Sequence, residues 1–309
     1  MTQIDPIKFI DRETSQVKVE RVYGQEFLNW LYNSKSGNAL SDYICRKPLS
    51  ALYGVMQDSV FSKRKVKQFI KDFEIQMSDY LPGESAVPGK APYKSFNEFF
   101  IRRFRPGARQ FPQEAHVMGA VAEARYLGYR EIRPEQTFPL KGESLSPQAI
   151  LRDSERAKIF RGGPLLIARL CPVDYHRYHY PDDGRVERLY RVPGRLHSVN
   201  PMALKFKQDT FASNERVVSI LETKNFGKIA YIEVGAICVG RMVQSHDISQ
   251  SFQRGQEKGY FLFGGSTVVL MGEKGAWYPS IDILENSHNK IETFIKLGSP
   301  IAQANIKAQ

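Results

Sequence analysis

Short apolar runs separated by glycine, proline and aspartate fill the chain from about residue 115 to residue 280. The clearest of these runs are residues 165–170, 185–192, 217–221, 229–234 and 260–270. Their valines, isoleucines and aromatic residues suit a buried pleated surface, and most of the runs are shorter than an ordinary helix. Because turn residues recur between them at short intervals, the pattern predicts a β-rich domain of the sandwich or barrel-like kind.

The first 92 residues follow a different pattern. Residues 21–80 are predicted to be helical, and the strongest segment is 63–80, where apolar residues recur at helical spacing: Val66, Phe69, Ile70, Phe73 and Met77. Three prolines and two glycines between Pro82 and Pro92 indicate a linker or long loop. We therefore expect an α+β fold, in which an N-terminal helical layer and linker over residues 1–92 precede a β-rich domain over residues 93–309.

Two short helices are predicted inside the β-rich part. Ser95 and Glu98 have the spacing of a capping box, and the helix that they begin should stop at Pro106-Gly107. A second helix is expected over about 146–156, because Ser146 is a good N-cap and Pro147 suits the first helical position.

The balance of charge favours an anionic partner. The formal net charge is +11 and the pI is about 9.4. No interleaved array of aromatic and basic residues typical of an RNA-binding sheet is present, so we expect no nucleic-acid partner. An apolar stretch over residues 49–61 precedes the basic run Lys63-Arg64-Lys65-Val66-Lys67. This combination fits a helix at the surface of an anionic membrane, and it equally fits a helical bundle with a solvated charged edge.

Any membrane contact is expected to be peripheral. No uncharged apolar run approaches the roughly 18 residues that span a bilayer. The first 30 residues leave no room for the core of a signal peptide, because they contain many charged side chains, among them Asp5, Asp11, Arg12, Glu13, Lys18, Glu20 and Arg21. The three cysteines, Cys45, Cys171 and Cys238, lie far apart and show no disulfide framework or zinc spacing, so no metal is expected.

Two segments carry residues suited to chemistry. His176 and His179 follow the apolar run 165–170, and histidine transfers protons readily near neutral pH. A structural turn would also explain this pair, whereas a metal site would need a third ligand that is not obvious in the sequence. Ser266 follows Gly264-Gly265 between two apolar runs, which by itself is an ordinary signal for a turn between strands.

The serine has a second interpretation. A serine hydroxyl placed after glycine can attack the carbonyl of the preceding residue, here Gly265, because a glycine without Cβ lets the peptide bend and be approached closely. The ester formed in this way can eliminate across Ser266 and hydrolyse, which leaves a pyruvoyl group on a new N-terminus. A histidine oriented by a carboxylate would supply the base that such a serine needs.

The chain resembles the phosphatidylserine decarboxylases from about Ser95 to Gly298. The resemblance rests on short motifs in the family's order: Ser95-Phe96-Asn97-Glu98-Phe99-Phe100 with Arg102 and Arg103, Arg105-Pro106-Gly107-Ala108-Arg109, Lys141-Gly142, Asp174-Tyr175-His176-Arg177 with His179, Pro193-Gly194 with Ser198-Val199-Asn200, Phe211-Ala212 with Asn214-Glu215-Arg216, Val234-Gly235-Ala236, Val239-Gly240, Lys258-Gly259 and Gly264-Gly265-Ser266-Thr267.

The resemblance implies a self-cleaving proenzyme. Cleavage between Gly265 and Ser266 would give a β chain, 1–265, and an α chain, 266–309, headed by a covalent pyruvoyl group made from Ser266. The family's pattern also implies that His179 is the base for cleavage and that His176 serves decarboxylation. Glu123 stands where relatives carry an aspartate that partners the base, so either Glu123 takes that role or another acid serves.

The activity implied is the conversion of phosphatidylserine to phosphatidylethanolamine, with the pyruvoyl ketone forming a Schiff base with the substrate amine before CO₂ leaves. The expected partners are phosphatidylserine, an anionic phospholipid membrane and the two chains of the same precursor, with a homodimer left open. The expected location is the cytoplasmic face of a bacterial cell membrane, as a peripheral protein. Two alternatives remain open at this point: a pyruvoyl decarboxylase of a soluble amino acid, and a cleavage-defective relative that only binds anionic membranes.

Overall fold

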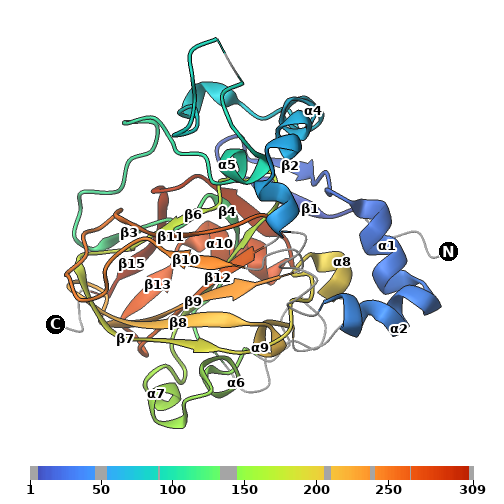
Figure 1. Cartoon of the computed structure of the whole chain (residues 1–309). Helices are drawn as coiled ribbons and strands as arrows, with labels where there is room; N and C mark the ends of the chain where they lie inside the picture. The colour runs from blue at the N-terminus through green and yellow to red at the C-terminus, as the bar shows by residue number, and fades with distance from the viewer. Residues whose placement is uncertain are drawn as a thin grey trace.

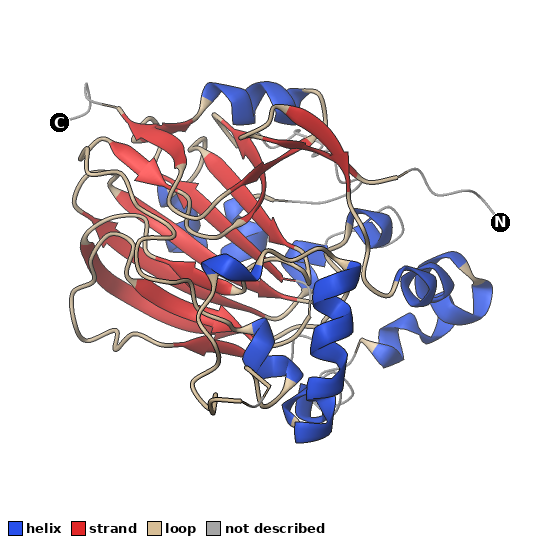
Figure 2. Ribbon diagram, turned by 90° about the horizontal axis from the view of Figure 1, so that it is seen from above, coloured by secondary structure: helices blue, strands red, loops and turns tan. Residues whose placement is uncertain are grey.

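The structure is a computed structural model, and it describes residues 6–45, 54–89, 91–132, 145–204, 210–236, 241–264 and 266–305. It confirms the α+β fold, with one large mixed sheet and two small ones (Figures 1 and 2). The strand order of each sheet is open, so within these residues the barrel-like alternative is not seen. Gly265, Cys238 and residues 49–53 of the apolar stretch lie outside the described residues.

The large sheet has nine strands in the order β2-β1-β14-β4-β5-β12-β9-β8-β7. In chain order these are β1 (Lys8–Asp11), β2 (Gln16–Val19), β4 (Ala124–Tyr129), β5 (Leu165–Leu170), β7 (Gly184–Val192), β8 (Arg216–Thr223), β9 (Lys228–Gly235), β12 (Ser266–Gly272) and β14 (Glu292–Ile295). All neighbouring pairs are antiparallel except β1 and β14, which run parallel.

Two three-stranded sheets accompany the large sheet. One has the order β10-β11-β6, with β6 (Arg177–His179), β10 (Met242–Gln244) and β11 (Glu257–Phe261). The other has the order β13-β15-β3, with β3 (Val117–Gly119), β13 (Trp277–Pro279) and β15 (Pro300–Ala304).

The helices are short. They are α1 (Gln25–Asn33), α2 (Lys35–Ile44), α4 (Arg64–Asp72), α5 (Phe96–Phe100), α6 (Pro147–Leu151), α7 (Ser154–Ile159), α8 (Pro201–Leu204), α9 (Thr210–Ser213) and α10 (Ile281–His288), with the 3-10 turns η1 (Val60–Lys63) and η2 (Met77–Asp79). In Figure 1, α1, α2 and α4 lie along one side of the molecule, and α6 and α7 lie below the sheet.

Each face of the large sheet has its own hydrophobic core, because successive residues of a strand point to opposite faces. Along β12, Val268 and Leu270 pack with β11, β6 and β13, whereas Val269 and Met271 pack with α6, α7 and α9. The central strands are therefore buried on both faces, which explains why they are continuous apolar runs instead of alternating ones.

Three helix predictions were wrong in extent. The helix that Ser95 begins ends at Phe100 and not at Pro106-Gly107, because Phe104 instead forms an isolated β-bridge with Tyr80. The helix expected over 63–80 ends at Asp72, because Glu74 takes a left-handed backbone with φ 52° and the chain then forms loops and η2. The helix expected over 146–156 is two helices, since Arg152 has φ 54° and Asp153 begins a new one. Both N-caps are confirmed: the Ser95 and Ser146 hydroxyls accept from the backbone N–H groups of Glu98 and Ala149.

The N-terminal part contributes strands as well as helices. β1 and β2 extend the large sheet through the pairing of β1 with β14, which belongs to the predicted α chain. The division of the chain at residues 92/93 stays a prediction.

The turn expected around Gly264 is not a hairpin. β11 pairs with β10 and β6, while β12 pairs with β5 and β9, so the chain crosses from a small sheet to the large one between Phe261 and Ser266. The reason is that β11 is covered on both edges by strands of its own sheet and leaves no edge for β12.

Candidate active site

Ser266 is the first residue of the central strand β12. Its backbone lies between Leu170 of β5 and Gly235 of β9, and its side chain is fully buried. Its Oγ has no hydrogen-bond partner within the described part of the chain. Because a buried hydroxyl without a partner is costly, such a group calls for a functional explanation.

His176 lies beside the segment that leads to Ser266. Its Nδ1 is 3.0 Å from the carbonyl oxygen of Asp174, which can only accept, so Nδ1 carries the proton and Nε2 carries the lone pair. Burial lowers the pKa of His176 to about 3, and the Gly264 backbone acts in the opposite direction. The imidazole is therefore neutral at pH 7 and close to Gly264.

The segment before Ser266 is held by the helix α5. The amide of Phe263 donates to Oδ1 of Asn97 at 2.9 Å, and the Phe263 ring packs edge-on against Phe96 and Phe100. Phe100 also covers the ring of His176, with centroids 3.8 Å apart. The motif around Ser95 thus positions both the histidine and the residues that precede Ser266.

His179 points to different partners. Its Nδ1 donates to the carbonyl of Gly255 at 2.8 Å, and its Nε2 is 3.2 Å from the hydroxyl of Tyr175. Since the carbonyl fixes the proton on Nδ1, the Tyr175 hydroxyl must donate to the Nε2 lone pair of the neutral ring. Burial lowers the pKa of His179, which favours this neutral form. Among the residues that the structure describes, no hydrogen bond joins His179 to Ser266, so the role of His179 in cleavage stays a prediction.

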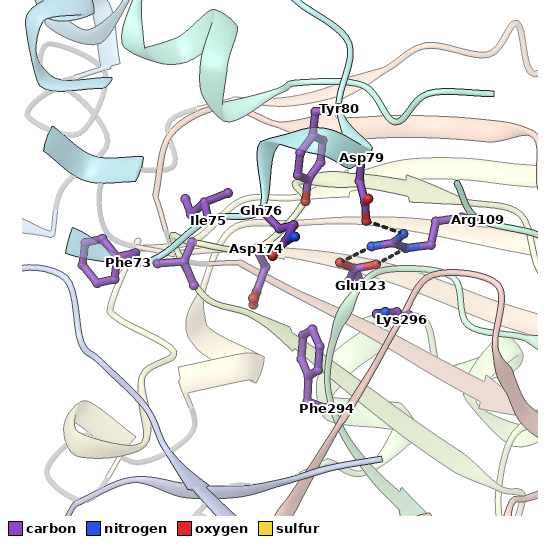
Figure 3. A pocket seen from close by; sticks show the side chains of 11 residues that line it. Phe73, Ile75, Gln76, Asp79, Tyr80, Arg109, Glu123, Asp174, Phe294 and Lys296 are labelled. Carbon is purple, nitrogen blue, oxygen red and sulfur yellow. Dashed lines mark hydrogen bonds and ion pairs between the residues drawn. The ribbon is translucent and has the colours of Figure 1, made fainter. Parts of the chain in front are cut away.

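Glu123 is paired with Arg109. The guanidinium donates to both carboxylate oxygens, at 2.6 and 3.0 Å, and also to Asp79 at 3.0 Å (Figure 3). The amide of Leu297 donates to the same carboxylate. Within the described residues no hydrogen bond joins Glu123 to His179, so the role of Glu123 in cleavage stays a prediction.

Glu123 and Arg109 line a cavity of about 460 Å³. Its wall combines Phe73 and Ile75 of the N-terminal part with Phe294 and Lys296 of the predicted α chain (Figure 3). Asp174, which also lines it, is buried, and burial raises its pKa to about 6. Ser266 and the two histidines are not among the lining residues, so this cavity does not surround the serine.

A buried ionic network joins the two predicted chains. Arg169 of β5 donates to Glu20 at 2.7 Å and to Glu292 at 2.5 Å, and Arg125 of β4 donates to Asp174 at 2.6 Å and pairs with Glu20 at 3.1 Å. Glu20 precedes the predicted cleavage site and Glu292 follows it. No motif signalled this network, because its acids stand alone in the sequence.

Sequence reasoning missed several residues around the site. Asn97 and Tyr175 lie inside two of the family motifs. Only the fold shows that Asn97 contacts Phe263 and that Tyr175 contacts His179. The described residues hold no group of three or more His, Cys, Asp or Glu side chains able to bind a metal ion. None of the helices described is both long enough and apolar enough to cross a membrane.

Comparison with known proteins identifies the family. The sequence model of the family described as phosphatidylserine decarboxylase matches residues 96–303. This chain belongs to the phosphatidylserine decarboxylase family. Its relatives include the phosphatidylserine decarboxylase proenzyme of Fusobacterium nucleatum subsp. nucleatum, 39% identical over 298 residues that cover 95% of this chain and 96% of the relative.

Two clostridial relatives have the same name. The phosphatidylserine decarboxylase proenzyme of Clostridium tetani is 37% identical over 297 residues, and that of Clostridium kluyveri is 38% identical over 296 residues. Each alignment covers 96% of this chain and 98% of the relative. The similarity therefore includes the N-terminal part as well as the region that carries the motifs.

Proposed function

We propose that this chain is the proenzyme of a phosphatidylserine decarboxylase, a carboxy-lyase that makes phosphatidylethanolamine. The family membership supports the reaction. The observation that carries the proposal for this chain is Ser266, which begins a fully buried central strand with a hydroxyl that has no partner among the described residues. It follows Gly264 by two residues, and the Gly264 backbone interacts with the buried, neutral His176.

Self-cleavage at Gly265-Ser266 is the first step of the proposal. It divides the chain into residues 1–265 and 266–309 and turns Ser266 into a pyruvoyl group. β12 is hydrogen-bonded on both edges, to β5 and β9, so the new N-terminus stays fixed after the peptide bond is cut. A pyruvoyl group supplies a ketone that withdraws electrons from the α-carbon of an amino acid as CO₂ leaves.

The two histidines have separate roles in this proposal. His179 serves cleavage once Tyr175 no longer donates to its Nε2. For Glu123 to act as its carboxylate partner, Glu123 leaves Arg109 and replaces the Gly255 carbonyl as the acceptor from Nδ1. His176 serves decarboxylation, because its Nε2 lone pair is unpartnered among the described residues and its ring is fixed by Phe100 and the Asp174 carbonyl. The hydrophobic walls around His176 exclude water from the reacting atoms.

An intact mass spectrum tests self-cleavage. We expect the wild-type 35.3-kDa chain to give two chains, the smaller one blocked by pyruvoyl and sensitive to hydroxylamine, and Ser266→Ala to give one uncut chain. Glu123→Gln should slow cleavage if Glu123 partners His179. A wild-type chain that remains whole would refute the proposal and favour a relative that only binds membranes.

Activity assays separate the remaining alternative. A phosphatidylserine decarboxylase should release CO₂ from phosphatidylserine in vesicles and not from free serine. Release from free serine at a higher rate would instead identify a decarboxylase of a soluble amino acid.

The membrane contact is proposed to lie around η1 and the start of α4. Val55, Met56, Val60 and Phe61 are exposed apolar residues, with Phe61 77% exposed. They are followed by the exposed cations Lys63, Arg64, Lys65 and Lys67. Apolar side chains that enter the interface and cations that meet anionic headgroups together give peripheral binding. On the opposite face of α4, Phe69 packs on Phe96 and Phe99 of α5. The proposed membrane contact is therefore next to the helix that holds the segment before Ser266.

Vesicle sedimentation tests this contact. Val60→Ser with Phe61→Ser should weaken binding to vesicles containing an anionic phospholipid by roughly 10-fold or more, because both side chains lose burial in the interface. Val17→Ser is a matched control, since Val17 is 59% exposed and Val60 57% exposed, yet Val17 lies on β2. Equal binding by the two variants would place the contact elsewhere.

A further inference from the structure

Two buried polar atoms that have no partner among the described residues lie on the same side of the large sheet. One is Oγ of Ser266, and the other is Oε2 of Glu233. Ser266 is on the same face of β12 as Val268 and Leu270, and Glu233 is on the same face of β9 as Tyr231 and Ile229. All four of these apolar and aromatic residues belong to one core cluster.

The strand register brings Ser266 and Glu233 close together. Ser266 is directly opposite Gly235, and Glu233 is directly opposite Val268, so Ser266 and Glu233 are diagonal neighbours. The Cα atoms of such a pair are about 7–8 Å apart, which a long side chain can cover. Gly235 has no side chain, so none projects from β9 directly opposite Ser266.

Glu233 is held from the other direction by Lys258. The Nζ of Lys258, on β11, donates to Oε1 of Glu233 and to Oε1 of Gln244, each at 2.6 Å. Three tyrosine rings surround Nζ at 5.2 to 5.9 Å: Tyr178, Tyr180 and Tyr231. One carboxylate oxygen is thus fixed while the other stays unpaired.

Stability alone does not explain this pair. Both side chains are at most 1% exposed, and burial raises the pKa of Glu233 and lowers that of Lys258. Taking two charges out of water costs about as much as their attraction returns, so apolar residues of similar size would serve the fold as well. A role at the neighbouring Ser266 accounts for both the buried pair and the unpaired Oε2.

We propose that Glu233, held by Lys258, accepts the hydrogen bond of the Ser266 hydroxyl and thereby aims the Oγ lone pair at the Gly265 carbonyl for self-cleavage. Glu233 is a positioning residue in this proposal: it holds the single hydroxyl proton of Ser266 in the uncut chain, and that proton passes to the base described above as Oγ attacks. The inference rests on the proposed self-cleavage and adds a residue to it. It requires a rotation of the Ser266 side chain about its Cα–Cβ bond that turns Oγ toward Oε2 of Glu233, while Oε1 stays bonded to Lys258.

Two double variants test the proposal. Glu233→Gln with Lys258→Met removes both charges but keeps an acceptor oxygen at position 233, whereas Glu233→Leu with Lys258→Met removes the acceptor as well. We expect the first variant to cleave within about 10-fold of the wild-type rate, and the second to cleave about 10- to 100-fold more slowly than the first, the cost of losing a hydrogen bond to the reacting hydroxyl. Rates are measured from the appearance of the two chains by mass spectrometry.

A third variant controls for folding. Glu233→Met with Lys258→Gln contains the same two new side chains as the first variant in exchanged positions, and its melting temperature is compared with that of the first variant. We expect Glu233→Met with Lys258→Gln to cleave slowly even when it melts at the same temperature as Glu233→Gln with Lys258→Met. The role of Glu233 would be overturned if Glu233→Gln with Lys258→Met cleaved at the same rate as either of the two variants that lack an acceptor at position 233. Failure of the wild-type chain to cleave would instead overturn the proposed function.

Discussion

Replacing Arg169 by methionine should destabilise the protein by about 3–5 kcal/mol. This is the largest effect on stability that we expect from a single substitution. Arg169 is buried between Glu20 and Glu292. Its removal leaves Arg125 as the partner of Glu20 and takes from Glu292 the cation that neutralises it. Burial raises the pKa of Glu20, but the cations Arg169 and Arg125 hold it down at about 2. The measurement is urea unfolding of the uncut Ser266→Ala protein at pH 7.

The pH dependence of this effect has a defined sign. The pKa of Glu20 is lower in the folded protein than its ordinary value of 4.5, so its stabilising contribution is complete above that value. The contribution is lost as the pH falls through the folded-state pKa of about 2. The difference between wild type and Arg169→Met should therefore be constant near neutral pH and shrink in acid.

A matched control uses another arginine with a carboxylate partner. Arg185 pairs with Glu222 at 2.6 Å, but their side chains are 72% and 46% exposed. Arg185→Met should cost about 0–1 kcal/mol, because solvent and salt screen an exposed pair. Similar losses from the two substitutions would show that the network around Arg169 contributes little beyond ordinary packing.

Replacing Asn97 by alanine should slow self-cleavage by about 10- to 100-fold. Its Oδ1 accepts from the amide of Phe263, three residues before Ser266, and its Nδ2 donates to Asp58 at 2.8 Å. Without this anchor the segment before the scissile bond moves, and a displacement of about 1 Å can cost a factor of about 100 in rate. The rate is followed by gel electrophoresis or mass spectrometry of freshly synthesised chain.

The control for Asn97 is an asparagine on the surface. The amide of Asn33 donates to Asn29 on the exposed side of α1, far from Phe263 in the sequence. Asn33→Ala should cleave at the wild-type rate. Normal cleavage by Asn97→Ala, with normal thermal stability, would show that the Phe263 amide is not what holds the cleavage segment.

The strands and helix starts were predictable because their signals are local. The apolar run 165–170 is the strand β5 with the same bounds, and Ser95 and Ser146 cap helices as their sequences predict. Each of these features depends on residues within a few positions of one another. The end of the helix at Asp72 was not predictable from apolar spacing, which continues to Met77, because the left-handed Glu74 interrupts the backbone.

The partners of the site residues could not be predicted, since they come from distant parts of the chain. Asn97 and Phe263 are 166 residues apart, and Arg169 and Glu292 are 123 residues apart. Tyr175 and His179 are only four residues apart, yet their hydrogen bond depends on how β6 is placed against the Gly255 carbonyl. Spacing in the sequence therefore suggested which residues matter and not which atoms they contact.

The sequence by itself determined the β-rich character of the protein and its family motifs, and it predicted cleavage at Ser266, because side-chain chemistry and local backbone preference depend on short segments. Only the tertiary structure decided that β11 and β12 belong to different sheets, that Glu123 pairs with Arg109, and that Glu233 lies on the same face of the large sheet as Ser266. Sheet pairing and register are set by contacts between distant strands, and a shift of one residue would turn Glu233 to the opposite face.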